Sequence, residues 1–129
     1  MKDTTGKVYF AIKSEDERLE LTQFEKYITL KPTRFEKMFA RLTVPKCTIW
    51  KFGTPKLVNA HYFNEIESLM DVLVLHKQEF INFRNAFPEV ELVLQVVIYV
   101  GDETPALHFS QRAIAFANAV GAPIDCDIY

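Results

Sequence analysis

Two acidic residues near the end of the chain, Asp125 and Asp127, are two positions apart in a segment whose polar and apolar residues alternate. Residues two apart on a strand point to the same face of a sheet. Alternation places a histidine and two tyrosines on that face as well, His108, Tyr99 and Tyr129. Such groups could hold a polar ligand or, through the histidine and the carboxylates, transfer protons. A half-exposed sheet with solvated side chains would show the same pattern. We therefore treat the five as candidate ligand-binding residues and assign no catalytic residue.

The second candidate surface comes from the distribution of charge. Residues 26–56 carry eight bases and one acid, a net charge of +7, whereas residues 57–129 carry three bases and ten acids, a net charge of −7. Complementary potentials steer a protein toward a partner of opposite charge. The candidate partner-binding residues are therefore bases of this segment and its tryptophan: Lys31, Arg34, Lys37, Arg41, Trp50 and Lys51. Two alternatives need no partner: the basic segment lies against acidic elements of its own fold, and Trp50 lies in the core.

The sequence contains no motif for a metal, a phosphate group or a cofactor. The histidines His61, His76 and His108 lack the spacing of metal ligands. The four glycines are far apart, so no glycine-rich loop can surround a phosphate. We therefore predict neither a metal nor a cofactor.

Other features indicate a cytoplasmic protein. Cys47 and Cys126 have neither metal-ligand nor disulfide spacing, which predicts two reduced thiols in the core. The longest apolar run, residues 96–100, is far shorter than the ~20 residues of a membrane span. Residues 1–6 are polar and are not followed by the apolar region of a secretory signal. The net charge of −2 and the lack of RRM, KH and zinc signatures disfavour nucleic acid as a partner.

The elements that must position the candidate ligand-binding residues lie in the last third of the chain. In order, they are a strand over 89–100, a short strand over 106–109, a helix over 110–120 and a strand over 123–129. The first of these has six aliphatic residues in strict alternation. Ser110 is expected to cap the helix and Gly121 to end it. In the last strand Ile124, Cys126 and Ile128 are expected to face the core.

The first two thirds of the chain alternate between strands and helices. In order, we expect a strand over 7–14, helices over 22–30 and 35–42, a strand over 47–52 and a long helix over 62–87. Thr22 and Thr33 each precede a glutamate by three positions, which is the capping-box pattern at the beginning of a helix. The apolar run before His76 predicts a break in the long helix.

These elements predict one α+β domain over residues 1–129. An antiparallel or mixed sheet would have the helices over 22–30 and 110–120 packed on its apolar face. The ββαβ order at the end of the chain permits a ferredoxin-like relative. The polar face would carry Tyr9, Lys13 and Gln95 beside the candidate ligand-binding residues, unless the helix over 62–87 covers it.

Four short segments occur in the order found in a known family. They are Phe10-Ala11-Ile12, Leu30-Lys31-Pro32-Thr33, Thr48-Ile49-Trp50 and the closing residues 123–129. In this order they resemble the bacterial family called domain of unknown function 4279, over almost the whole chain. The resemblance implies a bacterial protein without an established activity, so no catalytic residue is carried over from it.

Three functions remain open from the sequence. The one we favour is a non-enzymatic protein-interaction domain that docks through complementary charge, for example an immunity-type protein or a homodimer. The second is a small-molecule-binding regulatory domain that uses the polar sheet face. The third is an enzyme, which requires His108 within hydrogen-bonding reach of Asp125 or Asp127, roughly 2.6–3.2 Å or one water away.

Overall fold

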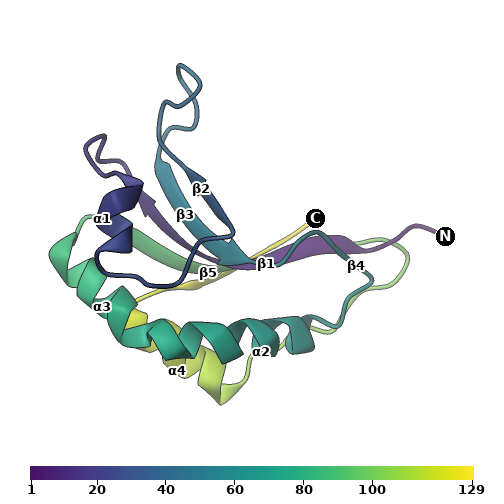
Figure 1. Ribbon diagram of the computed structural model, residues 1–129. Helices are drawn as coiled ribbons and strands as arrows, with labels where there is room; N and C mark the ends of the chain where they lie inside the picture. Colours follow the sequence, from purple (N-terminus) through teal and green to yellow (C-terminus); the bar gives the residue numbers. More distant parts are fainter.

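A computed structural model describes residues 1–129 as a mixed, six-stranded sheet with helices packed against it (Figure 1). The strands are β1 (Thr5–Ser14), β2 (Arg34–Glu36), β3 (Thr48–Gly53), β4 (Leu57–Val58), β5 (Glu91–Tyr99) and β6 (Ile124–Ile128). The helices are α1 (Leu21–Glu25), α2 (Tyr62–Leu73), α3 (Lys77–Ala86) and α4 (Gln111–Val120), with a 3-10 turn, η1 (Val74–His76), between α2 and α3. The strand order is β2-β3-β1-β5-β6, with β4 paired to the beginning of β1. The predicted α+β class is confirmed.

The two central strands carry the apolar alternation that the sequence predicts. β1 and β5 pair antiparallel, from Thr5 opposite Tyr99 to Lys13 opposite Glu91. On one face their alternate side chains are at most 3% exposed: Val8, Phe10, Ile12, Leu92, Leu94, Val96 and Ile98. Strands with one apolar face must bury it against another layer, and this face is where the helices pack.

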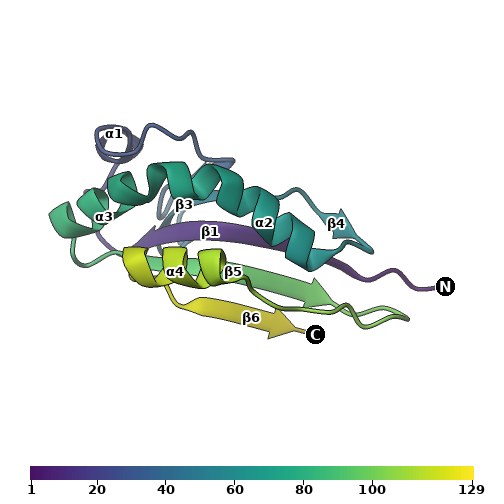
Figure 2. The same cartoon turned by 90° about the horizontal axis from the view of Figure 1, so that it is seen from below.

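The helices lie together on this apolar side of the sheet, which leaves the other side without a covering layer (Figures 1 and 2). The predicted break falls where expected, because η1 ends at His76 between α2 and α3. The predicted stripe of α2 is buried, and α3 contributes Phe80 and Phe83, both 0% exposed. The helix over 62–87 therefore packs on the apolar face and not on the polar one. None of the helices is long and apolar enough to cross a membrane.

Aromatic rings connect the two layers. The Phe80 ring of α3 lies 4.8 Å from that of Phe10 in β1 and 5.8 Å from that of Trp50 in β3, between ring centroids. Phe116 of α4 packs edge-on against Phe10 at 5.4 Å. Such tilted and edge-to-face pairs add roughly 0.5–1.5 kcal/mol each beyond the burial of their area. These contacts fix α3 and α4 on β1 and β3.

The last third of the chain is a βαβ unit with the predicted helix ends. The Ser110 hydroxyl accepts a hydrogen bond from the Ala113 amide at 3.1 Å, and Gly121 ends α4 with φ of 74°, in the left-handed region that favours glycine. β5 and β6 are parallel and direct neighbours. A ferredoxin-like split βαβ unit would place another strand between them, so the sheet here has a different strand order.

Of the two helices predicted near the beginning of the chain, the one over 35–42 is wrong and the one over 22–30 is shorter than predicted. Residues 35–42 form no helix, because Phe35 lies in β2 opposite Trp50 and packs edge-on against the Phe24 ring at 5.6 Å. The first helix is short, Leu21–Glu25, and Glu20 takes the capping position that the sequence assigns to Thr22. The amide of Glu20 donates to the Gln23 side-chain oxygen at 2.6 Å. At residues 35–42 tertiary packing overrides a local capping pattern, whereas at the first helix another local capping pair, Glu20 and Gln23, replaces the predicted one.

The predicted short strand over 106–109 is also absent. Both edges of β5 are already paired, one with β1 and one with β6, so no edge is free for a hairpin partner. Residues 106–109 instead connect β5 to α4 without strand pairing. The expectation that Leu107 and Phe109 face inward is confirmed, because both side chains pack against the core.

The last strand faces as predicted but is buried less than predicted. Ile124, Cys126 and Ile128 pair with core-facing residues of β5, which places them on the helix side. Ile128 is nevertheless 57% exposed and Cys126 is exposed, because β6 is the edge strand and the helices cover the centre of the sheet. Cys47 is only half-buried. The prediction of two core thiols is therefore wrong.

Candidate functional site

The side of the sheet that the helices leave uncovered (Figures 1 and 2) is called the open face, and it carries the alternate side chains of each strand that point away from the helices. Strand register identifies its residues, because partners across a ladder share a face. Tyr9 of β1 lies between Gly53 of β3 and Gln95 of β5, and Gln95 is followed by Asp125 of β6. The neighbouring row joins Arg34, Lys51, Ala11 and Val93.

One half of the open face is basic. Lys7, Arg34, Lys51 and Lys56, called the basic cluster, surround a shallow hollow of about 480 Å³ that also contains Tyr9. An adjoining hollow of about 230 Å³ shares Lys7, Tyr9, Lys51 and Lys56. The cluster comes from three strands and the turn after β3. Strand pairing therefore gathers bases that are far apart in the sequence.

Lys51 is held at the centre of this cluster. Its ammonium nitrogen lies over the Tyr9 ring, 4.3 Å from the ring centroid, which is a cation–π distance. Partial burial, together with the positive charges of Lys7 and Arg34, lowers the pKa of Lys51. A lowered lysine pKa means that the charged form is penalised. The carboxylate of Glu36 acts in the opposite direction, but the net effect leaves this ammonium group less stabilised than it would be in water.

The opposite edge of the open face is acidic. Asp125 and Asp127 of β6, called the acidic edge, lie beside Gln95, whose amide donates to the Asp127 carboxylate at 3.0 Å. Burial, followed by the charges of Asp127 and Asp125, raises the pKa of Tyr9. Tyr9 thus lies between the two charged regions and is influenced by both.

The basic segment is not neutralised by its own fold. Arg34 pairs with Glu36 of the same strand, and Lys37 pairs with Glu20. No carboxylate lies within the 4.0 Å ion-pair distance of the other six bases of residues 26–56: Lys26, Lys31, Arg41, Lys46, Lys51 and Lys56. None of the eight pairs with an acid of residues 57–129. The alternative in which acidic elements of the chain cover this segment is therefore not what the structure shows.

Four of the five candidate ligand-binding residues share the open face. Asp125 and Asp127 lie there with Tyr99 and Tyr129, whose rings stack at 5.2 Å between centroids. His108 does not join them. Its ring stacks on Phe63 of α2 at 4.3 Å, in the connection between β5 and α4, where the sequence predicts a strand. The acid/base arrangement of His108 with the aspartates is therefore absent from the fold.

The candidate partner-binding residues divide into four groups. Arg34 and Lys51 belong to the basic cluster, whereas Lys31 and Arg41 are exposed outside it, Arg41 in the loop that projects between β2 and β3 (Figure 1). Trp50 is 1% exposed and lies in the core, so it cannot meet a partner. Lys37 is used within the chain.

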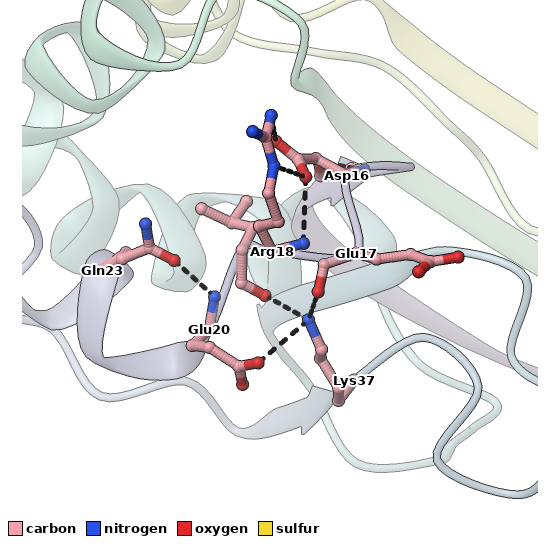
Figure 3. Close-up of polar contacts among 8 residues, drawn as sticks. Asp16, Glu17, Arg18, Glu20, Gln23 and Lys37 are labelled. Carbon is pink, nitrogen blue, oxygen red and sulfur yellow. Dashed lines mark hydrogen bonds and ion pairs between the residues drawn. The ribbon is translucent and has the colours of Figure 1, made fainter.

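Lys37 ties the loop after β2 to the turn after β1 (Figure 3). Its ammonium group donates to the backbone oxygens of Glu17 and Leu19, the latter at 2.9 Å, and pairs with Glu20 at 3.2 Å. Its side chain is 27% exposed. We therefore remove Lys37 from the binding surface and assign it a structural role.

Two members of the basic cluster escaped the sequence analysis. Lys7 lies outside the basic segment, but its position two residues before Tyr9 on β1 places it on the same face. Lys56 belongs to the segment but follows β3 in a turn, where alternation gives no direction. No group of three or more histidine, cysteine or acidic side chains is arranged to hold a metal ion.

A comparison with protein-family models matches residues 3–129 to the domain of unknown function DUF4279. No curated protein and no solved structure matches the chain. The match covers every helix and strand described above, from β1 to β6. The chain belongs to the DUF4279 family.

Proposed function

We propose that this protein is a binding domain that recognises an acidic protein surface through the basic cluster on its open face. One observation supports the proposal above all: Lys7, Lys51 and Lys56 gather on an uncovered sheet face, and none of the three forms an ion pair with an acid of its own fold. Lone charges exposed to water are ordinary. Several cations of one sign around a shared hollow create a potential that attracts and orients a partner of opposite sign.

The environment of Lys51 adds a thermodynamic reason. Burial and neighbouring cations lower the pKa of this lysine, so its charge is unfavourable in the unbound protein. A carboxylate placed near it would remove that penalty and would raise the pKa of Lys51 again. The Tyr9 ring beside it offers apolar area, and tyrosine is enriched at the centres of interfaces.

A small anionic ligand is the second candidate. The smaller hollow, about 230 Å³, lies between the rings of Tyr9 and Tyr99, with lysines at its border. Ligand pockets usually have volumes of ~300–1,000 Å³, so this hollow alone suits only a small molecule. A thermal-shift screen of anionic metabolites tests the candidate, because a ligand at about 100 times its dissociation constant adds ~2.7 kcal/mol to the free energy of unfolding. The same shift in a Lys51→Gln variant would contradict binding at this place.

The main proposal is tested with a defined acidic probe, a fluorescently labelled deca-glutamate peptide. Binding is followed by fluorescence anisotropy at low and moderate salt. The test variant is Lys51→Gln with Lys56→Glu. The control is Lys26→Gln with Lys77→Glu, which changes the net charge equally at exposed positions outside the open face.

Binding by the control variant should match that of the unchanged protein, and binding by the test variant should be lost or at least about tenfold weaker. Affinity should fall as salt rises, because exposed charges are screened beyond ~8 Å at physiological ionic strength. Equal weakening in both variants would show that only net charge matters, and the proposed site would be rejected.

A further inference from the structure

We infer that the acidic surface bound by the basic cluster is β6 of a second copy of this chain, so that two open faces pack together in a two-fold symmetric dimer. This inference rests on the proposed function and names the partner of the same site. It follows from the way in which charge is distributed across the sheet, from one edge to the other.

The open face is polarised along the strand order. The basic cluster occupies the β2–β3 side and the beginning of β1, whereas Asp125 and Asp127 lie on β6 at the other edge. Lys51 and Asp125 are in strands separated by β1 and β5. At ~4.8 Å between neighbouring strands, Lys51 and Asp125 are roughly 14 Å apart. Lys7 and Asp127 share a row in which only Val97 of β5 lies between them, so they are roughly 10 Å apart. Both separations exceed the screening length of ~8 Å at physiological salt. No ion pair joins the two regions within one chain.

A two-fold axis can bring the basic cluster of each copy opposite the acidic edge of the other. If the axis runs parallel to the strands near β1, the second copy is turned over and its strand order is reversed. With the axis between β1 and β5, β3 of each copy lies across from β6 of the other, and β1 lies across from β5. The basic cluster meets the acidic edge twice, once on each side of the axis, as an isologous interface requires. Face-to-face packing of two sheets about 10 Å apart is also a common arrangement of β-sandwiches.

The side chains between the two charged regions suit the middle of such an interface. Tyr9, Val93 and Val97 are half-buried on the open face, and Ala11 and Gln95 are already buried. At the β6 side the stacked rings of Tyr99 and Tyr129 are 54% and 69% exposed. Exposed aromatic rings with charged residues at the border are typical of interfaces.

The available area predicts a weak dimer. Five strands spaced by ~4.8 Å, with lengths averaging roughly 20 Å, cover a flat area of roughly 500 Å² per copy before side-chain relief is added. A stable interface buries about 800 Å² per partner. The area available on the open face is toward the lower end of the range for protein–protein interfaces. We therefore expect association at micromolar or higher concentration, with a strong dependence on salt.

Pairing of two copies along the edge of β6 is the competing arrangement. An antiparallel β6–β6 ladder about a two-fold axis would place the acidic edge of one copy beside that of the other. Like charges directly across a ladder are destabilising. The polarity of the open face therefore favours face-to-face packing over edge pairing.

The test uses two charge variants of the full chain in sedimentation equilibrium. The base variant is Lys51→Gln with Lys56→Glu. The acid variant is Asp125→Lys with Asp127→Asn, which keeps an amide oxygen to accept the hydrogen bond from Gln95. Each changes the net charge by three units, in opposite directions. Circular dichroism and thermal unfolding confirm that both variants fold, and Asp125→Lys alone replaces the acid variant if it does not.

We expect the unchanged protein to reach twice the mass of one chain at low salt, and each variant alone to associate about tenfold more weakly or not at all. An equimolar mixture of the two variants should form a heterodimer, because the intact basic cluster of the acid variant can meet the intact acidic edge of the base variant. If mixing the two variants restores association, unfolding cannot be the reason why each variant associates weakly alone.

Two results would overturn the inference. A mass of one chain at every concentration and salt would exclude self-association, while binding of the deca-glutamate peptide would still support the proposed function. A dimer that both variants leave unchanged, or a mixture that does not associate, would show that the basic cluster and β6 do not face each other.

Discussion

Replacing Phe80 with alanine should remove a large part of the stability, because this ring joins three elements of the core. Phe80 is 0% exposed and its ring centroid lies 4.8, 5.8 and 6.1 Å from those of Phe10, Trp50 and Phe116. These neighbours belong to β1, β3 and α4, so they cannot close together around the cavity.

Two estimates of the loss agree. Phenylalanine-to-alanine changes in cores cost about 3–5 kcal/mol, with the larger values at sites that cannot collapse. An aromatic side chain buries roughly 150–250 Å², which at ~25 cal/mol per Å² amounts to about 4–6 kcal/mol, and part of this remains with alanine. We therefore expect Phe80→Ala to lower the free energy of unfolding by about 4 kcal/mol, a large share of the ~5–15 kcal/mol of a typical domain.

Urea unfolding followed by tryptophan fluorescence measures this loss. Trp50 is the single tryptophan, is 1% exposed and lies against the Phe80 ring, so its emission reports on the same cluster. The control is Phe63→Ala, whose half-buried ring stacks on exposed His108 and should cost only about 1 kcal/mol. A loss no larger than that of the control would contradict the packing of α3 on β1 and β3.

Three further predictions concern other parts of the fold. Burial opposes ionisation of Glu79, but contacts with His76 at 2.8 Å and with Thr29 outweigh it and lower its pKa. Ionised Glu79 therefore stabilises the folded state fully above the unfolded-state pKa of ~4.3. This contribution to the free energy of unfolding is lost as the pH falls through the lower pKa of Glu79 in the folded state. Glu79→Gln should cost about 1–2 kcal/mol at pH 7, a difference that should shrink in urea titrations below about pH 4; a constant difference would refute the charge-based explanation. Lys37→Met should cost about 1–3 kcal/mol in thermal or urea unfolding, because it leaves carbonyl groups without a donor, and an effect as small as that of the exposed Lys46→Met would contradict its structural role. Burial and the charges of Asp125 and Asp127 raise the pKa of Cys126, so maleimide labelling in a Cys47→Ser background should be slow at pH 7 and faster in Asp125→Asn; equal rates would argue against an effect of that carboxylate.

The elements that local pattern predicts are those with a single strong periodicity. β1 and β5 alternate without interruption, and α4 has both a serine cap and a closing glycine, so each can be located from its own residues. The errors fall where long-range pairing decides. Phe35 lies in a strand although the residues around it have helical spacing, because it packs against Phe24 and lies opposite Trp50. The local sequence gives no indication of these two contacts.

The candidate site was predictable in part for the same reason. Alternation correctly placed Tyr99, Asp125 and Asp127 on one face once β5 and β6 were recognised as strands. It failed for His108, which follows a strand that does not form. Lys7 and Lys51 meet only because β3 pairs with β1, and strand order cannot be read from composition or spacing.

Backbone amide chemical shifts, recorded while the protein is titrated with deca-glutamate, test most directly whether the basic half of the open face is the binding surface. The largest changes are predicted in β1, in β3 and in the turn that contains Lys56, with little change in α2 and α4 on the other side of the sheet. Changes concentrated on the helices, or no changes at low salt, would contradict the claim.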